Sequence, residues 1–144
     1  MIFDVPDETG AGSTTITVDP DLDGLGPEPA DSRSAGLGDF VWRLPQTGGA
    51  NVEELTARAQ QRANEASMRI KADGELDGSL YGHVLRVGEP VPVDGVGQKY
   101  AGTYYVDTVA HRFDVAGYKQ TFTLLRNAYG DNIQAGDSVL SAIL

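Results

Sequence analysis

The 144-residue chain contains no cysteine, which excludes disulfide bonds and thiol chemistry. It has only two histidines, His83 and His111, and no third nitrogen or sulfur ligand at the spacing of a metal site, which argues against zinc. No apolar run is long enough to span a membrane, and the start lacks the basic region and apolar run of a secretion signal. We therefore expect a soluble chain that is made in the cytoplasm and has no membrane span.

Basic residues are scarce in the first 39 positions, which hold nine acids and one base. The remaining residues carry twelve acids and ten bases, so most of the net charge of -10 belongs to the leading segment. Such an acidic chain is poorly suited to binding nucleic-acid phosphates, and we expect no sequence-specific nucleic-acid binding. Residues 1–39 are rich in Gly, Pro, Ser and Asp, and only 14–18 has the pattern of a strand. We expect an acidic N-terminal arm that is flexible or is ordered by partners, as when a strand is added to a neighbour's sheet.

Within this arm, Asp19, Asp21 and Asp23 imitate the start of a calcium-binding loop, with Gly24 at the sixth position. The pattern fails at the twelfth position, where Ala30 stands in place of a bidentate acid. We therefore assign no metal site and interpret the three aspartates, the only calcium-like candidates, as a solvated acidic turn.

Residues 40–130 are expected to form the ordered body, beginning with a short strand at 40–44. One helix is expected over about 52–71, because Asn51 is a good N-cap and Glu54 completes a capping box. An apolar stripe at helical spacing, made mostly of alanine, predicts close packing of this helix against a sheet or a second helix. The Asp73-Gly74 pair is expected to end the helix. The extension 131–144 carries no pattern that assigns its conformation.

After the helix the sequence turns to strands, at 80–87, at the edge-strand segment 91–93, and above all at 101–113 and 118–125. The last two are rich in Tyr, Val, Thr and Phe and are joined by a short break that ends in Gly117, which predicts a hairpin. Strict alternation gives neither strand a cleanly apolar face, which suits a small barrel or an assembled ring. The fold class is therefore predicted as α+β, mainly β.

The sequence displays no catalytic constellation. No serine stands in a nucleophile elbow, and no glycine-rich segment has the form of a phosphate loop. His111 and Asp107, which are four residues apart, lie on one face of an expected strand and are interpreted as a structural pair. We predict that the chain is not an enzyme and uses no cofactor.

Six positions of the central stretch stand in an unusual order and spacing: Gly102, Tyr104, Val106, His111, Gly117 and Tyr118. They follow a Pro-Val-Pro-Val-Asp-Gly segment at 90–95 and precede Arg126 and Asn127. In this order they resemble the late control D family, the baseplate hub proteins of contractile phage tails and related injection systems. These proteins are akin to the hub part of type VI spike proteins. The resemblance extends from about residue 51 to 126 and leaves the first 40 residues uncovered.

The resemblance implies a small β-barrel of the tail-tube kind, whose copies form a ring that connects the tail tube to the central spike. It implies no catalytic residues, and its partners are other copies of the chain, tail-tube and spike proteins and other baseplate subunits. The location implied is a virion tail or an extracellular injection particle, assembled in the host cytoplasm. Family hubs carry two such barrels and form trimers, whereas this chain has room for one. A shortened hub, a hub split between two chains and a single-barrel hexamer therefore stay open, and the alternative function is a stand-alone β module that binds carbohydrate or calcium.

Overall fold

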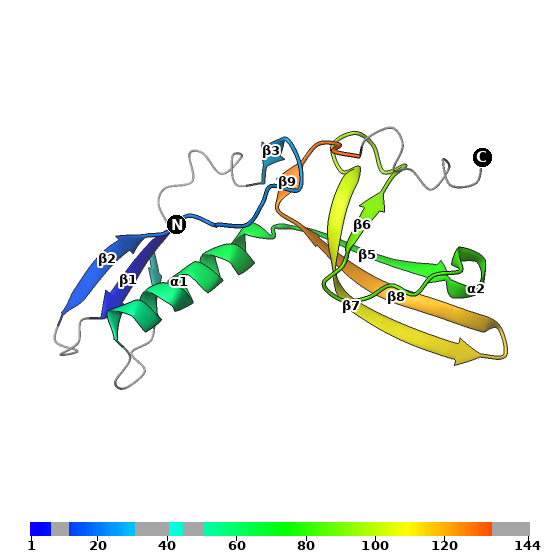
Figure 1. Cartoon of the computed structure of the whole chain (residues 1–144), viewed down its shortest axis with the longest axis horizontal. Coiled ribbons are helices and arrows are strands. Elements are labelled where there is room, and N and C mark those ends of the chain that lie inside the picture. Colours follow the sequence, from blue (N-terminus) through cyan, green and yellow to red (C-terminus); the bar gives the residue numbers. More distant parts are fainter. Residues whose placement is uncertain (7–11, 31–40, 45–50, 134–144) are drawn as a thin grey trace. The chain divides into compact units, whose positions relative to one another are not determined.

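The computed structural model describes residues 1–6, 12–30, 41–44 and 51–133. These residues belong to two compact units (Figure 1), a first unit of Met1–Asp23 with Arg33–Ser67 and a second unit of Gly24–Ser32 with Met68–Leu144. Strand makes up 46% of the described residues and helix 18%, so the chain is α+β and mainly β, as the sequence predicts. No helix in these ranges is long and apolar enough to cross a membrane.

The described elements are β1 (Ile2–Pro6), β2 (Ser13–Thr17), β3 (Glu28–Pro29), β4 (Val41–Arg43), α1 (Val52–Ser67), β5 (Ile70–Asp77), α2 (Gly78–Tyr81), β6 (Pro90–Val93), β7 (Gly102–Asp114), β8 (Gly117–Arg126) and β9 (Ala128–Tyr129). In the first unit they form one sheet and one long helix. In the second they form a four-stranded sheet and a two-stranded ribbon.

The sheet of the first unit has the strand order β2-β1-β4, with β1 antiparallel to β2 and parallel to β4. Phe3 stands opposite Ile16 of β2 and opposite Trp42 of β4. These three side chains therefore lie on the same face of the sheet. The strands expected near 14–18 and 40–44 are present as β2 and β4, although Phe40 lies outside the described residues.

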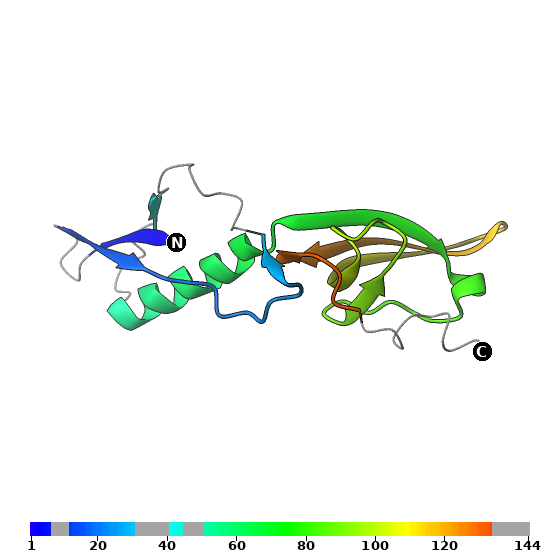
Figure 2. The same ribbon diagram turned by 90° about the horizontal axis from the view of Figure 1, so that it is seen from above.

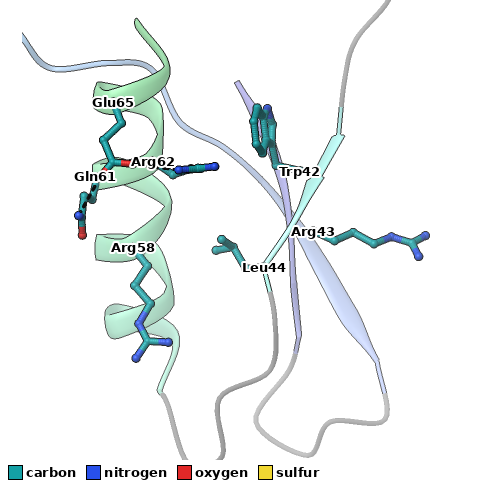
Figure 3. A pocket seen from close by; sticks show the side chains of 7 residues that line it. All are labelled: Trp42, Arg43, Leu44, Arg58, Gln61, Arg62 and Glu65. Atoms are coloured by element: carbon teal, nitrogen blue, oxygen red, sulfur yellow. Dashed lines mark hydrogen bonds and ion pairs between the residues drawn. The ribbon is translucent and has the colours of Figure 1, made fainter. Parts of the chain in front are cut away.

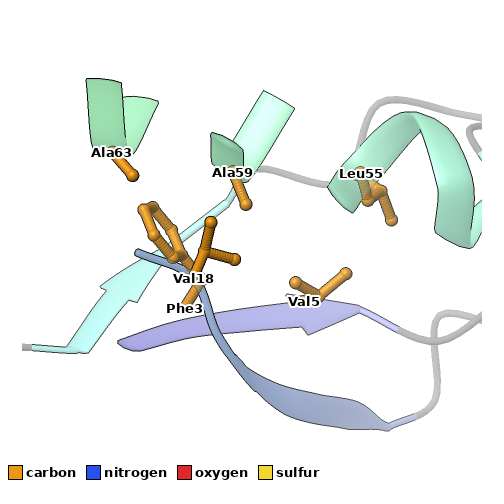
Figure 4. Packing of buried hydrophobic residues seen from close by; sticks show 6 residues of the cluster. All are labelled: Phe3, Val5, Val18, Leu55, Ala59 and Ala63. Carbon is orange, nitrogen blue, oxygen red and sulfur yellow. The ribbon is translucent and has the colours of Figure 1, made fainter. Parts of the chain in front are cut away.

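Helix α1 packs its alanine stripe against this face. The buried cluster, drawn in Figure 4, consists of Phe3, Val5, Val18, Leu55, Ala59 and Ala63. Phe3, Ala59 and Ala63 are completely buried. The short alanine side chains leave room for the large Phe3 ring between the helix and the sheet.

The leading residues differ from the expected arm. Instead of lacking a core of their own, the leading residues supply Phe3 and Val5 of β1, and Val18 just after β2, to the cluster with α1. In β1 the buried residues Phe3 and Val5 lie on one side of the strand, and Asp4 between them lies on the other. This period of two buries one side of the strand. The helix that was expected within the 40–130 body belongs to the unit of these leading strands.

The start of α1 follows the predicted capping, because the Glu54 amide donates to Asn51 Oδ1 at 2.8 Å. Its end differs from the predicted one. The helix stops at Ser67, and β5 begins at Ile70 and continues through the Asp73-Gly74 pair that was expected to end the helix. Pairing decides this, because all eight residues of β5 are in register with β8.

The sheet of the second unit is a curled half-barrel with the strand order β5-β8-β7-β6. The predicted hairpin is present as β7 and β8, and the predicted edge strand as β6. In both views β5, β8 and β7 run side by side, with α2 next to the far end of the hairpin (Figure 1 and Figure 2). The short ribbon of β3 and β9 brings residues 28–29 beside 128–129.

A β-bulge in β7 makes the strand faces that were predicted from strict alternation wrong for the residues after it. Val106 pairs with Leu124, but Thr108 pairs with Thr123, so Asp107 is an extra residue in β7. The bulge reverses the alternation, and the residues after it change sides relative to a regular strand. One face of the sheet then becomes apolar, formed by Ile70, Ala72, Val91, Val93, Tyr104, Val106, Val109, Phe122 and Leu124.

The opposite face is polar. Lys119 Nζ lies 2.7 Å from Glu75 Oε1, and this contact raises the pKa of Lys119. The Thr123 hydroxyl donates to Asp73 at 2.7 Å and lowers the pKa of that carboxyl. The sheet therefore separates an apolar side from a solvated one.

The prediction of a strand at 80–87 is wrong. Residues Gly78–Tyr81 form the short helix α2, and 82–89 is a connection that has no strand assignment. Asp77 caps α2, since its side chain accepts from the amides of Ser79 and Leu80. An aspartate in a turn thus overrides the β-forming tendency of the residues that follow.

Candidate functional site

The second unit is held together around one buried cation, Arg126, whose side chain is completely buried. Its Nε and Nη2 donate to the carbonyl oxygen of Leu25, at 3.1 and 2.7 Å. Nη1 donates to Ala101 O at 2.6 Å, and Nη2 also donates to Gly130 O. A single side chain therefore joins the segment before β3, the turn before β7 and the end of β9.

The family-motif position Gly102 lies directly against this guanidinium. A Cβ atom built on Gly102 would stand 2.3 Å from Arg126 Nη2, and its φ of 134° is one that other residues rarely adopt. Gly26 is similarly close, with its hypothetical Cβ 2.7 Å from the same nitrogen. Both glycines make room for Arg126, which gives Gly102 a structural role.

Tyr104 and Val106, two further motif positions, form the apolar face beside this anchor, with 2% and 1% of their surface exposed. The Tyr104 hydroxyl donates to Tyr100 O at 2.7 Å, and its ring lies 5.2 Å from the Arg126 guanidinium carbon. The ring therefore covers the cation while its hydroxyl keeps a hydrogen-bond partner.

The last three motif positions lie at the hairpin end. Gly117 closes the two-residue turn with a φ of 115°, while no other residue type in the described ranges has a positive φ. Tyr118 stacks on Phe113, with ring centroids 4.4 Å apart, and its hydroxyl lies 2.8 Å from His111 Nδ1. The hydrogen-bond partner of His111 is thus Tyr118, whereas the sequence pairs it with Asp107. The predicted pair fails on distance, because residues four positions apart along a strand are separated by about 13 Å.

A second buried polar group, Gln120, fixes the connection 82–89 across the sheet. Gln120 is completely buried. Its Oε1 accepts from the Leu85 amide and its Nε2 donates to His83 O, both at 2.8 Å. Both halves of the amide are therefore satisfied by backbone from one crossing segment.

Next to the hairpin end lies a group of exposed apolar side chains that we call the tip patch: Leu80, Tyr81, Phe113 and Val115. Leu80 is 87% exposed and Phe113 is 75% exposed. The two parts of the patch are adjacent, because the Tyr118 ring that stacks on Phe113 also lies over Gly78 of α2. Clusters of exposed apolar residues on soluble proteins mark interaction surfaces. The tip patch is therefore the candidate functional site.

The three calcium-like aspartates are not grouped as metal ligands in the structure. Asp21 Oδ1 accepts from Asn64 Nδ2 at 2.5 Å, and the Asp21 amide donates to Asn64 Oδ1 at 3.0 Å. Asp21 therefore connects the acidic segment to α1. Across the described ranges, no three acidic, histidine or cysteine side chains are grouped as metal ligands.

The structure thus places all six motif residues in the second unit, with three at the Arg126 anchor and three at the hairpin end. Sequence reasoning missed the anchor itself and the tip patch. The sequence offered one signal for Arg126, because this residue directly follows an apolar strand and precedes an asparagine. The structure shows that the asparagine is also buried. The Asn127 side chain accepts from the Leu25 amide at 2.9 Å and so assists the same junction.

Comparison of the chain with protein-family models, with curated proteins and with solved structures gives no match.

Proposed function

We propose that the chain is a structural baseplate hub subunit, which forms a ring between the tail tube and the central spike of a contractile phage tail or injection system. The tip patch carries this proposal. Four exposed apolar side chains at the hairpin end and in the adjacent helix α2 are costly to leave in water, at about 25 cal/mol per Å² of apolar surface, and contact with a neighbouring subunit removes that cost.

The incomplete barrel supports the same function. In the described part of the second unit, the half-barrel ends at β5 on one side and at β6 on the other. Strand edges left unpaired within one chain are sites where a neighbouring chain can add. The half-barrel is the part of this chain that corresponds to the tail-tube-like barrel of the resembling family, and its copies would lie in a virion tail or an extracellular particle.

The role of the motif residues also supports the proposal. Gly102 and Tyr104 accommodate the buried anchor, and Gly117 and Tyr118 shape the hairpin end that presents the tip patch. In this account the six positions build and present an assembly surface, and none of them reacts with a substrate.

The test is the assembly state of tip-patch variants. Val115→Asp and Phe113→Ser should lower the mass of the assembled species in sedimentation velocity, because they place a charge or a polar group in the subunit contact. Val96→Asp is the matched control, since Val96 is also an exposed valine of the second unit. An unchanged mass for both tip-patch variants, or an equal loss in the control, would contradict the proposal.

A further inference from the structure

The first unit contains a groove that the hub function does not use. It has a volume of about 490 Å³ and lies between α1 and β4, within the size range of ligand sites. The lining residues are Trp42, Arg43, Leu44, Arg58, Gln61, Arg62 and Glu65. Figure 3 shows Trp42 of β4 and Leu44, the residue after β4, pointing toward the helix. Arg62 extends from the helix toward Trp42, and Arg43 points away.

The groove has a small positive charge in an acidic protein. In its lining Arg58 and Arg62 outnumber Glu65, while Arg43 points away and lies 3.6 Å from Asp4 Oδ2. The whole chain, in contrast, has a net charge of -10. The Arg62 guanidinium lies 5.2 Å from the Trp42 ring centroid, so one wall combines a positive charge with an aromatic surface. Such a lining is complementary to a carboxylate carried on a chain with apolar groups.

The Glu65 carboxylate already forms an ion pair with one of these arginines, Arg62. Its Oε2 lies 3.0 Å from Arg62 Nη1, and its Oε1 accepts from Gln61 at 3.0 Å. Hydrogen bonds from Gln61 and from Arg62 lower the pKa of Glu65, so this carboxylate stays ionised near neutral pH. Glu65 is therefore an internal model of the anion that the arginines can hold.

Beside the groove, β4 offers a strand edge. In the described residues β4 pairs only with β1, in parallel, and the Leu44 amide continues this ladder by donating to Asp4 O at 3.2 Å. Backbone groups alternate along a strand, so those of Val41 and Arg43 face the other edge. A peptide that adds to this edge has every second side chain on the helix-facing side, beside Trp42 and Leu44.

We propose that this groove binds an extended acidic segment of a partner protein, which adds a strand to β4 and places carboxylates against Arg58 and Arg62. Backbone hydrogen bonds along β4 hold the segment, and the arginines select acidic side chains. The hairpin and tip patch of the second unit take no part in this binding.

The probe is a short capped peptide in which aspartate or glutamate alternates with valine. Trp42 is the only tryptophan of the chain, so its fluorescence reports directly on the groove of the intact protein. The acidic peptide should shift Trp42 emission saturably, while a peptide with lysine in place of each acid should not. A version with proline at alternate positions should also fail, because proline cannot donate to the strand edge.

Two variants with opposite expected effects on peptide binding make the test sharper. Arg62→Gln should weaken binding of the acidic peptide by roughly tenfold, the effect of losing one charge-assisted hydrogen bond. Glu65→Gln should strengthen it, because it removes the internal competitor. Arg112→Gln in the second unit is the matched control, with the same charge change on a side chain that is 75% exposed, and should leave binding unchanged.

The other outcomes overturn the proposal. Equal binding of acidic and basic peptides, or no shift of Trp42 emission, excludes an acidic occupant. Equal binding of the proline version leaves an anion site without strand addition. If Arg62→Gln leaves peptide binding unchanged but lowers the native mass of the protein, the groove is an interface between copies of this chain.

Discussion

The two units of this chain build their interiors in different ways. The buried cluster of the first unit is entirely hydrocarbon, with a phenylalanine enclosed by valines, a leucine and alanines. The second unit has an apolar cluster of similar size, but it also buries the side chains of Arg126 and Gln120 completely. Each of these two polar groups bonds to backbone that is distant in the sequence.

The difference shows what each kind of contact specifies. Apolar burial is not directional, so it holds a helix on a sheet without fixing the path of the connecting segments. Hydrogen bonds from a buried side chain are directional and fix the positions of particular loops. The second unit needs this, because its half-barrel is crossed by segments 24–30 and 82–89, which have little regular structure of their own.

The largest expected effect comes from removing the buried cation. Arg126→Met leaves the carbonyls of Leu25, Ala101 and Gly130 without their donor, which should destabilise the second unit by at least about 3 kcal/mol. Trp42 fluorescence, which reports on the first unit, should keep its unfolding midpoint, while circular dichroism shows an earlier transition. Arg112→Met, at an exposed site, is the control. Equal shifts of both signals would contradict the independence of the two interiors.

An apolar truncation tests the first unit in the same way. Leu55→Ala should destabilise it by about 2–3 kcal/mol, because the lost methyl groups leave a cavity under α1. The Trp42 unfolding midpoint should therefore fall in denaturant titrations. Val52 lies on the same helix but is half exposed, so Val52→Ala should change the midpoint much less. A similar fall for both variants would contradict the claim that the buried cluster supports this unit.

A smaller effect is expected where an aromatic ring lies over a glycine. Gly74 pairs with Phe122, and a Cβ on Gly74 would stand 2.6 Å from the ring. Gly74→Ala should cost about 1–2 kcal/mol, and the cost should shrink in a Phe122→Leu background, as a double-mutant cycle measures. Gly24→Ala, where the added atom meets only an ordinary contact, should be nearly neutral. Additive costs in the cycle would contradict direct contact.

The smallest effect is electrostatic and concerns one carboxylate in each unit. Hydrogen bonds lower the pKa of Glu65 in the first unit and of Asp73 in the second. Because the folded pKa lies below the unfolded one, each carboxylate stabilises at neutral pH and the contribution is lost as pH falls through the folded pKa. Glu65→Gln and Asp73→Asn should each flatten the acid limb of stability against pH slightly. A steeper limb would reverse the assigned sign.

Features that depend on neighbouring residues could be predicted from the sequence. Asn51 and Glu54 located the start of α1, and the pattern around Gly117 located the hairpin, because capping and turn geometry are local. The mainly β fold class followed from the same strand patterns. The end of α1 could not be predicted in this way. A glycine after a helical pattern predicts a helix stop, and only the tertiary structure shows that Gly74 pairs with Phe122 in a strand.

Features that depend on distant partners were missed. The bulge at Asp107 is set by the register with β8, so strict alternation assigned the residues after it to the wrong face. Arg126 would ordinarily be exposed, and only the carbonyls that surround it make burial possible. The alternation of Phe3 and Val5 around Asp4 was an available signal for β1, but the surrounding acidic composition favoured an arm.

The native mass of the purified protein, together with negative-stain images of the same sample, decides whether the chain is a ring subunit as proposed. A ring subunit should give a trimer or hexamer with a central opening, which would also show whether one barrel per chain is sufficient for the ring. A compact monomer that persists across the accessible concentration range, with or without added tail-tube and spike proteins, would contradict the proposal.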